Sequence, residues 1–148
     1  MKKIILVIFC LLISCSISHA SSAIKWHSYE EGMINAKKNG KKIFLHFWAP
    51  WCGYCGKMKN KTFNNPQVSD YLNTNFISIK INTDKEKKIA LKYYVKGLPD
   101  SWFLTKKGEK IGNLPGYIPP EKFLPMLKYI LTDSYKSMNY KKFLETKK

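Results

Sequence analysis

The stretch Trp51-Cys52-Gly53-Tyr54-Cys55 decides the fold, because it places two cysteines with two residues between them. It follows a mostly apolar run, Ile43 to Trp48, which has the length and composition of a buried strand. We therefore expect the cysteines where a strand ends and a helix begins. The first turn of a helix has unpaired N–H groups and the positive end of the dipole, and both favour a thiolate. The pattern predicts a redox pair in which Cys52 attacks and Cys55 resolves.

Half of a zinc site is a second interpretation of two closely spaced cysteines. Zinc usually takes four protein ligands, as two such pairs or as one pair with two histidines. The other cysteines, Cys10 and Cys15, lie near the N-terminus, and the histidines beyond them, His27 and His46, are far apart. A haem attachment motif requires a histidine directly after Cys55, where the sequence has glycine. We therefore expect no metal and no cofactor.

Residues 1–20 have the features of a secretory signal peptide. Two lysines follow Met1, and the apolar run from Ile4 to Ile13 is too short to span a bilayer as a stable helix. Two processing sites compete: cleavage before Ser21, which we favour, and a lipoprotein-type box that would attach lipid to Cys15. Both predict a periplasmic or other extracytoplasmic protein, bound to a membrane only if Cys15 is lipidated. A lone cysteine pair in an oxidising compartment indicates chemistry rather than a structural disulfide.

The chain is long enough for one domain, and its charge is strongly positive. It has 148 residues, 45% of them hydrophobic, and a net charge of +16. Every basic residue is lysine, and recognition of bases and phosphates depends largely on arginine. We interpret the lysines as a solvated surface and expect no nucleic-acid partner. The expected organisation is a monomer with one domain, residues 21–132, and a Lys-rich, weakly helical tail, residues 133–148.

Capping and turn signals divide this domain into alternating helices and strands. After a lead-in with room for a short strand, the expected elements are a helix from Ser28 to Asn39, a strand from Lys42 to Phe47, a helix from the cysteines to Phe63, a helix from Asn65-Pro66, a strand from Phe76 to Ile81, a helix from Asp84 with Tyr93 and Tyr94 facing inward, a hairpin of residues 101–105 and 110–114, and a helix from Pro119. Pro125 should kink that last helix or delay its start to Leu124.

The order of these elements predicts an α/β fold. A helical crossover joins the first two strands, which should therefore be parallel, whereas the hairpin adds antiparallel strands. The expected architecture is a four-stranded mixed sheet with helices on both faces.

With this order, the sequence resembles the thioredoxin family from about Ser28 to Leu131. The resemblance lies in Phe47-Trp48-Ala49-Pro50-Trp51-Cys52-Gly53-Tyr54-Cys55, Lys80-Ile81-Asn82-Thr83-Asp84, Tyr94-Val95-Lys96-Gly97-Leu98-Pro99, Gly108 and Gly116. Residues Thr62 to Val68 are similar to an exported subgroup that includes the C-terminal domain of transmembrane thiol–disulfide interchange proteins. The resemblance implies a thioredoxin-like fold and thiol–disulfide exchange.

The resemblance also implies roles for residues around the cysteine pair. Pro99 matches the family's cis proline, which packs against the disulfide; an ordinary trans turn is the alternative. Trp51 matches the tryptophan beside the nucleophile, and it could equally be a hydrophobic cover. Gly53-Tyr54 replaces the Gly-Pro of thioredoxin, resembles periplasmic disulfide isomerases and should help to set the redox potential. Weaker candidates for a substrate-facing rim are Leu98 and Tyr117.

One strand position departs from the family pattern. Six residues before the first cysteine, thioredoxins bury an acid that is thought to accept the proton of the resolving thiol with the help of a lysine. The matching positions of this chain are His46 and Lys80. Two interpretations remain open: neutral His46 relays the proton of Cys55, or His46 is a strand histidine that a backbone group satisfies.

These residues predict an enzyme that exchanges thiols and disulfides with exported proteins. Reduction or exchange is favoured over oxidation, and a membrane thiol–disulfide donor would restore the dithiol. Disulfide isomerase activity is less expected, because periplasmic disulfide isomerases are usually dimers with a separate dimerisation domain. The alternative is a non-catalytic thioredoxin-fold binding module, lipid-anchored or free, that would bind through its lysines; an intact cysteine pair argues against it.

Overall fold

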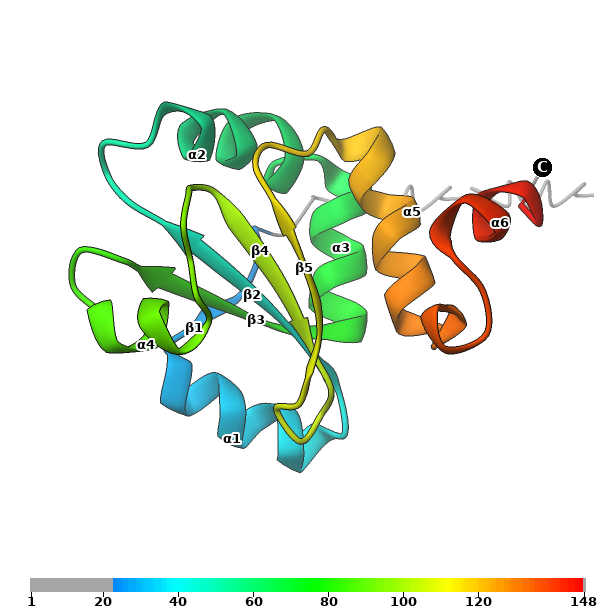
Figure 1. The fold of residues 1–148 in the computed structure, drawn as a ribbon, viewed down its shortest axis with the longest axis horizontal. Helices are drawn as coiled ribbons and strands as arrows, with labels where there is room; N and C mark the ends of the chain where they lie inside the picture. The colour runs from blue at the N-terminus through cyan, green and yellow to red at the C-terminus, as the bar shows by residue number, and fades with distance from the viewer. Residues whose placement is uncertain (1–22, 148) are drawn as a thin grey trace, which may run out of the picture.

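A mixed sheet of five strands forms the centre of the structure (Figure 1). The structure is a computed structural model that describes residues 23–147. Both processing sites, Cys15 and Ser21, lie outside these residues. The elements in chain order are β1 (Trp26–His27), α1 (Tyr29–Asn39), β2 (Lys42–Trp48), α2 (Gly53–Met58), the π-helical turn η1 (Lys59–Phe63), α3 (Pro66–Asn75), β3 (Phe76–Asn82), α4 (Lys87–Lys92), β4 (Asp100–Leu104), β5 (Lys110–Pro115), α5 (Pro120–Leu131), the 3-10 turn η2 (Ser134–Lys136) and α6 (Tyr140–Glu145).

The sheet has the order β1-β3-β2-β4-β5, with β2 at its centre. β1, β3 and β2 are parallel, whereas β4 and β5 are antiparallel to their neighbours, as the crossover and the hairpin predicted. The α/β class is confirmed, but the count of four strands is one too low. The additional strand is β1, which pairs at the edge with Ser78 and Ile79 of β3. Two residues are too few to show the alternation by which a strand is predicted.

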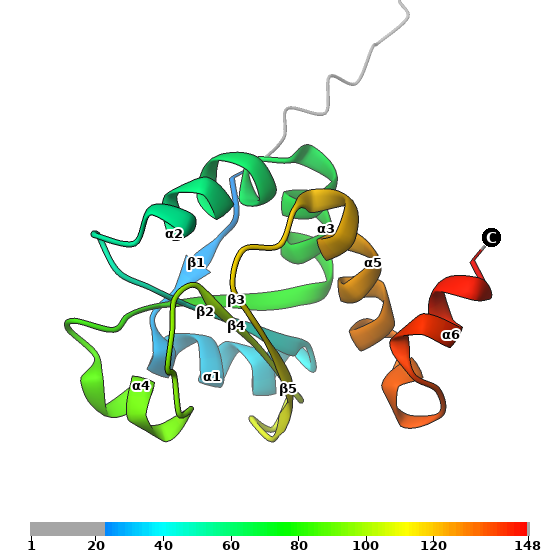
Figure 2. The same cartoon turned by 45° about the horizontal axis from the view of Figure 1, so that its top comes forward.

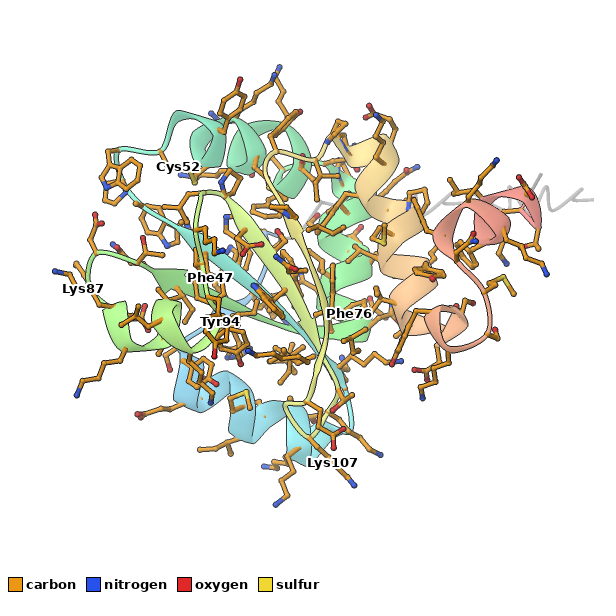
Figure 3. All side chains as sticks on the ribbon, in the orientation of Figure 1. Phe47, Cys52, Phe76, Lys87, Tyr94 and Lys107 are labelled. Carbon is orange, nitrogen blue, oxygen red and sulfur yellow. A yellow bond between two sulfur atoms is a disulfide. The ribbon has the colours of Figure 1, made fainter. Side chains whose placement is uncertain are left out.

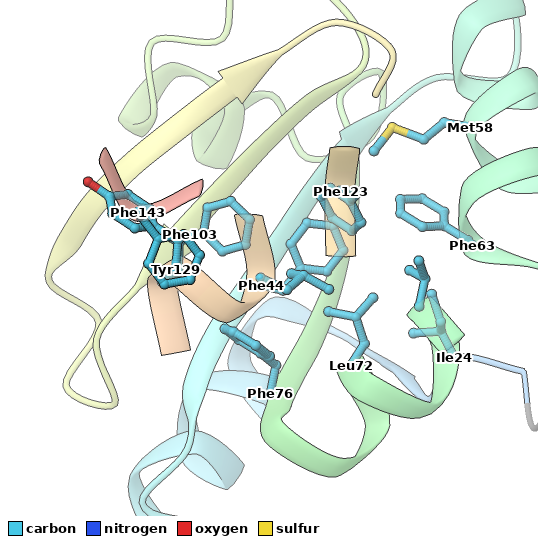
Figure 4. Close-up of a cluster of buried hydrophobic side chains, with 13 residues drawn as sticks. Ile24, Phe44, Met58, Phe63, Leu72, Phe76, Phe103, Phe123, Tyr129 and Phe143 are labelled. Carbon is cyan, nitrogen blue, oxygen red and sulfur yellow. The ribbon is translucent and has the colours of Figure 1, made fainter. Parts of the chain in front are cut away.

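Helices cover both faces of the sheet, and this explains why β2 is apolar almost throughout. Phe44 packs in a cluster with side chains from α3 and α5 (Figure 4), whereas Leu45 and Phe47 pack on the opposite face against α1 and α4. The alternation places His46 on the same face as Phe44. A polar side chain therefore lies within the apolar layer that leads to the cysteines.

The helix signals were largely correct, with two corrections around α4. Ser28 caps α1 and Asn65 caps α3, as predicted. α4 begins at Lys87 rather than Asp84, because the Asp84 N–H bonds to the Asn82 side chain in a turn. Tyr93 is buried as expected, but Tyr94 is 77% exposed. Its φ of 54° turns the chain after the helix, so the ring leaves the core.

The last helix and the segment after it are more ordered than predicted. α5 starts at Pro120 and continues through Pro125, so a delayed start at Leu124 is wrong. Burial of its apolar face, including Phe123, compensates for the missing hydrogen bond. α6 lies beside α5 (Figure 2). The two helices pack through Phe143, whose ring centroid lies 5.2 Å from that of Tyr129. No helix within residues 23–147 has the length and apolar character needed to cross a bilayer.

Candidate active site

The cysteines lie where β2 leads into α2, as the sequence predicted (Figure 3). Cys52 is the N-cap of α2, and its Sγ accepts a hydrogen bond of 3.1 Å from the backbone N–H of Cys55. The two sulfur atoms are joined in a disulfide. Among the described residues, no group of three or more His, Cys, Asp or Glu side chains could hold a metal ion. The arrangement is that of a redox pair.

The position of Cys52 at a helix start favours ionisation of its sulfur. After reduction, the N–H groups at the start of α2 stabilise a thiolate, and the continuation of the helix into η1 adds aligned dipoles. Cys52 has 8% of its surface exposed and Cys55 5%. The disulfide is therefore set into the protein surface, with Cys52 the more exposed of the two residues.

Two aromatic side chains project from the protein beside the disulfide. Trp51 is 71% exposed and Tyr54 is 63% exposed. The indole N–H of Trp51 lies 3.1 Å and 3.3 Å from the two carboxylate oxygens of Asp84. Asp84 ends the stretch from Lys80 that carries part of the family resemblance, but its contact with Trp51 was not predicted. Because Trp51 is so exposed, it is available to a partner rather than serving only as a cover.

The loop before β4 lies against the cysteines. The Leu98–Pro99 peptide bond is cis, as the resemblance implied. Leu98 packs against the cluster formed by Cys52 and Cys55 with Ala49. A groove of about 200 Å³ separates Trp51 from this loop and is lined on the loop side by residues 95–98. The site thus offers a groove beside the disulfide. Tyr117 contacts the helix of the cysteines, because the ammonium of Lys57 in α2 lies 4.5 Å from the Tyr117 ring centroid.

His46 and Lys80 lie behind the disulfide, as the resemblance implied. They are paired in register across β2 and β3, and a cavity of about 160 Å³ brings both side chains together with the two cysteines. His46 is only 1% exposed, and its Nδ1 atom has no hydrogen-bond partner. A backbone group therefore does not satisfy this nitrogen. Lys59, which also lines the cavity, was not singled out from the sequence.

The charges around this cavity follow from burial. Burial, with a smaller contribution from the neighbouring Lys80 ammonium, lowers the pKa of His46 to about 3, so the ring is neutral at pH 7. Burial also lowers the pKa of Lys80, with a further contribution from Lys59. The Lys80 ammonium lies 4.1 Å from the ring centroid of Trp48, a distance that allows cation–π attraction. A neutral histidine beside a lysine thus takes the place of the acid–lysine pair of thioredoxins.

The burial of His46 predicts a measurable pH dependence of stability. The unfolded chain binds the proton near the usual pKa of 6.5, whereas the folded chain binds it only near 3, so stability falls as pH drops through this window. At roughly 1.4 kcal/mol per pKa unit, the loss over the whole window is on the order of 5 kcal/mol, of which about 3 kcal/mol falls between pH 7 and pH 4. Urea unfolding of wild type and His46→Gln from pH 7 to pH 4 should show the wild type losing more stability. Parallel curves would contradict a buried, neutral ring.

Comparisons with known proteins agree with this geometry. The model of a thioredoxin-like domain matches residues 29–131. A thioredoxin of Pyropia yezoensis is 30% identical over 104 residues, which cover 70% of this chain and 91% of that protein. The thiol:disulfide interchange protein DsbD of Photorhabdus laumondii is 26% identical over 110 residues, which cover 71% of this chain. The chain spans only 19% of that longer relative.

A solved structure gives the same result for the fold. The solution structure of a thioredoxin from Thermus thermophilus matches with a TM-score of 0.68 and 27% identity, covering 74% of this chain and 88% of that one. Together with the bonded cysteines at the start of α2, these findings fix both fold and chemical class. The chain belongs to the thioredoxin-like family and is an oxidoreductase whose redox pair is Cys52 and Cys55.

Proposed function

We propose that this protein is an exported thiol–disulfide oxidoreductase that reduces or exchanges disulfides of extracytoplasmic proteins. The observation that carries the proposal is the Cys52–Cys55 pair at the start of α2, bonded and set into the surface beside a groove. A non-catalytic binding module would have no use for such a pair. The proposal follows the chemistry of the site, because a helix start and a second sulfur within bonding reach are what exchange requires.

The reaction conserves atoms and electrons in two exchanges. The Cys52 thiolate attacks one sulfur of a substrate disulfide, a mixed disulfide forms, and the other substrate sulfur leaves as a thiolate. Cys55 then loses its proton and attacks the Cys52 sulfur, and the second substrate thiolate leaves. The substrate has gained two electrons, and Cys52–Cys55 is oxidised.

Return to the dithiol requires an electron donor, and we propose a membrane thiol–disulfide protein for this step. The similarity to part of an interchange protein supports this class of partner. The basic and apolar N-terminus supports export. Mass spectrometry of the protein recovered from a cell envelope fraction tests export: a chain starting at Ser21 supports cleavage, and a lipidated Cys15 supports anchoring. A full-length chain in the cytoplasm would overturn export.

Trp51 provides a test of whether the enzyme acts on proteins. We expect Trp51→Ala to raise the KM for a protein disulfide about tenfold, while exchange with glutathione stays within twofold. The reason is that an exposed aromatic beside a groove contributes contact area for a large partner, worth about 1 kcal/mol or more, and little for the small glutathione disulfide. Steady-state reduction of insulin and of oxidised glutathione by the same preparations gives the comparison.

Ile34→Ala is the matched control for this test. Ile34 is 67% exposed and belongs to α1, on the side of the sheet away from α2 (Figure 1). Its truncation should leave both reactions unchanged. Equal losses for Trp51→Ala with insulin and with glutathione would show instead that Trp51 acts on the cysteines themselves.

A further inference from the structure

The cavity behind the disulfide has an unusual set of charges. Its charged and titratable side chains, besides the cysteines, are His46 from β2, Lys59 from η1 and Lys80 from β3. His46 is neutral at pH 7, whereas lysine is ordinarily a cation at neutral pH. Within the described chain, no Asp or Glu lines this cavity. Its net charge at neutral pH is therefore positive.

Two acidic side chains near the ends of the strands, Asp84 and Asp100, are engaged elsewhere. Asp84 accepts hydrogen bonds from the exposed Trp51 indole. Asp100 is buried, but it pairs in register with Phe47, whose side chain packs on the opposite face of the sheet from His46. Asp100 there accepts hydrogen bonds from the side chains of Trp102 and Asn113. Neither carboxylate neutralises the cavity.

We infer that Lys80, with Lys59, stabilises the reduced, thiolate form of the Cys52–Cys55 pair and thereby makes the disulfide a stronger oxidant. The inference rests on the proposed function and narrows it, because a higher reduction potential favours disulfide exchange over net reduction of substrates. Oxidised, the pair carries no charge; reduced, it carries a thiolate. A cation beside the sulfurs therefore favours only the reduced state, most strongly where burial weakens solvent screening. Stabilising the reduced dithiol raises the reduction potential.

The geometry makes Lys80 the main contributor. Its side chain is partly buried, and its ammonium is held between aromatic faces, 4.1 Å from the ring centroid of Trp48 and 5.9 Å from that of Trp26. Lys59 lines the same cavity but is exposed to solvent, so water screens its charge more effectively. His46, whose Nδ1 has no partner, adds no charge to the cavity. Because His46 occupies the position where thioredoxins have a carboxylate, that carboxylate is missing beside the Lys80 ammonium.

Equilibration with glutathione redox buffers at pH 7 tests the inference. The fraction of reduced protein, measured by thiol labelling and mass spectrometry, gives an equilibrium constant for each variant. We expect Lys80→Gln and His46→Asp each to shift this constant about tenfold toward the protein disulfide, which corresponds to about 30 mV for two electrons. The first removes the cation and the second neutralises it with a carboxylate. Because either variant could misfold, thermal unfolding of both is recorded, and the inference is judged on the equilibrium constant of each variant that folds.

Two matched controls separate local charge from general effects. Lys57→Gln removes the same charge two residues before Lys59, but Lys57 does not line the cavity and lies over Tyr117. His46→Gln replaces the ring without adding charge. Both should stay within twofold of the wild type. The inference would be overturned if the equilibrium constants of Lys80→Gln and His46→Asp stayed within twofold of the wild type. It would also be overturned if Lys57→Gln shifted the constant as much as Lys80→Gln does. Neither result would affect the proposed function. A wild type that does not exchange with glutathione would overturn the proposed function itself.

Discussion

Cys52→Ser is expected to abolish disulfide reduction, leaving the rate measured in buffer without protein. Serine preserves the size and the N-cap position of residue 52, but its hydroxyl does not ionise near neutral pH and cannot attack a disulfide. The measurement is the reduction of insulin in the presence of a small-molecule reductant. Because the variant cannot form the disulfide, its stability is compared with that of the reduced wild type, and the two should agree within about 1 kcal/mol.

Retention of more than one-tenth of wild-type activity in a folded Cys52→Ser variant would contradict this mechanism. Cys55 would then have to be the attacking residue. The structure argues against that assignment, because Cys55 lies inside α2, whereas Cys52 receives the N–H hydrogen bond at its start. Cys55 is also the less exposed residue of the pair.

Cys55→Ser is expected to convert the enzyme into a trap. Cys52 still attacks, but no second thiolate is present to release the substrate, so a mixed disulfide accumulates. With insulin, or with an extract of exported proteins, each variant molecule should bind at most one substrate chain through a bond that dithiothreitol cleaves. Non-reducing electrophoresis and mass spectrometry detect the adduct, and turnover should fall at least a hundredfold.

The double variant Cys52→Ser/Cys55→Ser is the control for trapping. It keeps the surface of the site, including exposed Trp51 and Tyr54, but it lacks both sulfurs and should trap nothing. Capture by the double variant would indicate ordinary adsorption to this lysine-rich protein. Full turnover by Cys55→Ser would show that resolution does not need the second cysteine.

The sequence specified the fold well where burial on both faces leaves a continuous apolar pattern. β2 is such a strand, β3 was predicted from its alternating apolar residues, and the capping residues Ser28 and Asn65 marked the helix starts correctly. β1 was not counted as a strand, because two residues carry no periodicity. Tyr94 was expected to face inward together with Tyr93, but a positive φ reverses the chain there, and local sequence does not specify it.

The cysteine pair was predictable because its chemistry depends on residues adjacent in sequence. The rest of the site depends on contacts between distant segments. Asp84 meets Trp51 across 33 residues, and Lys59 reaches the cavity from the turn after α2. The lack of a partner for His46 Nδ1 also depends on packing, since Phe63 approaches the ring from another element, 4.8 Å between centroids. Sequence placed His46 in the strand, but only the assembled core shows what surrounds it.

The most direct test of the account is the pH dependence of Cys52 alkylation in the reduced protein. Iodoacetamide reacts with the thiolate, so the rate follows ionisation of the sulfur, and mass spectrometry of Cys55→Ser assigns the modification to Cys52 alone. The account predicts a midpoint at least one pH unit below that of a free cysteine, which is about 8.5. A midpoint at or above this value would contradict the claim that the start of α2 activates Cys52.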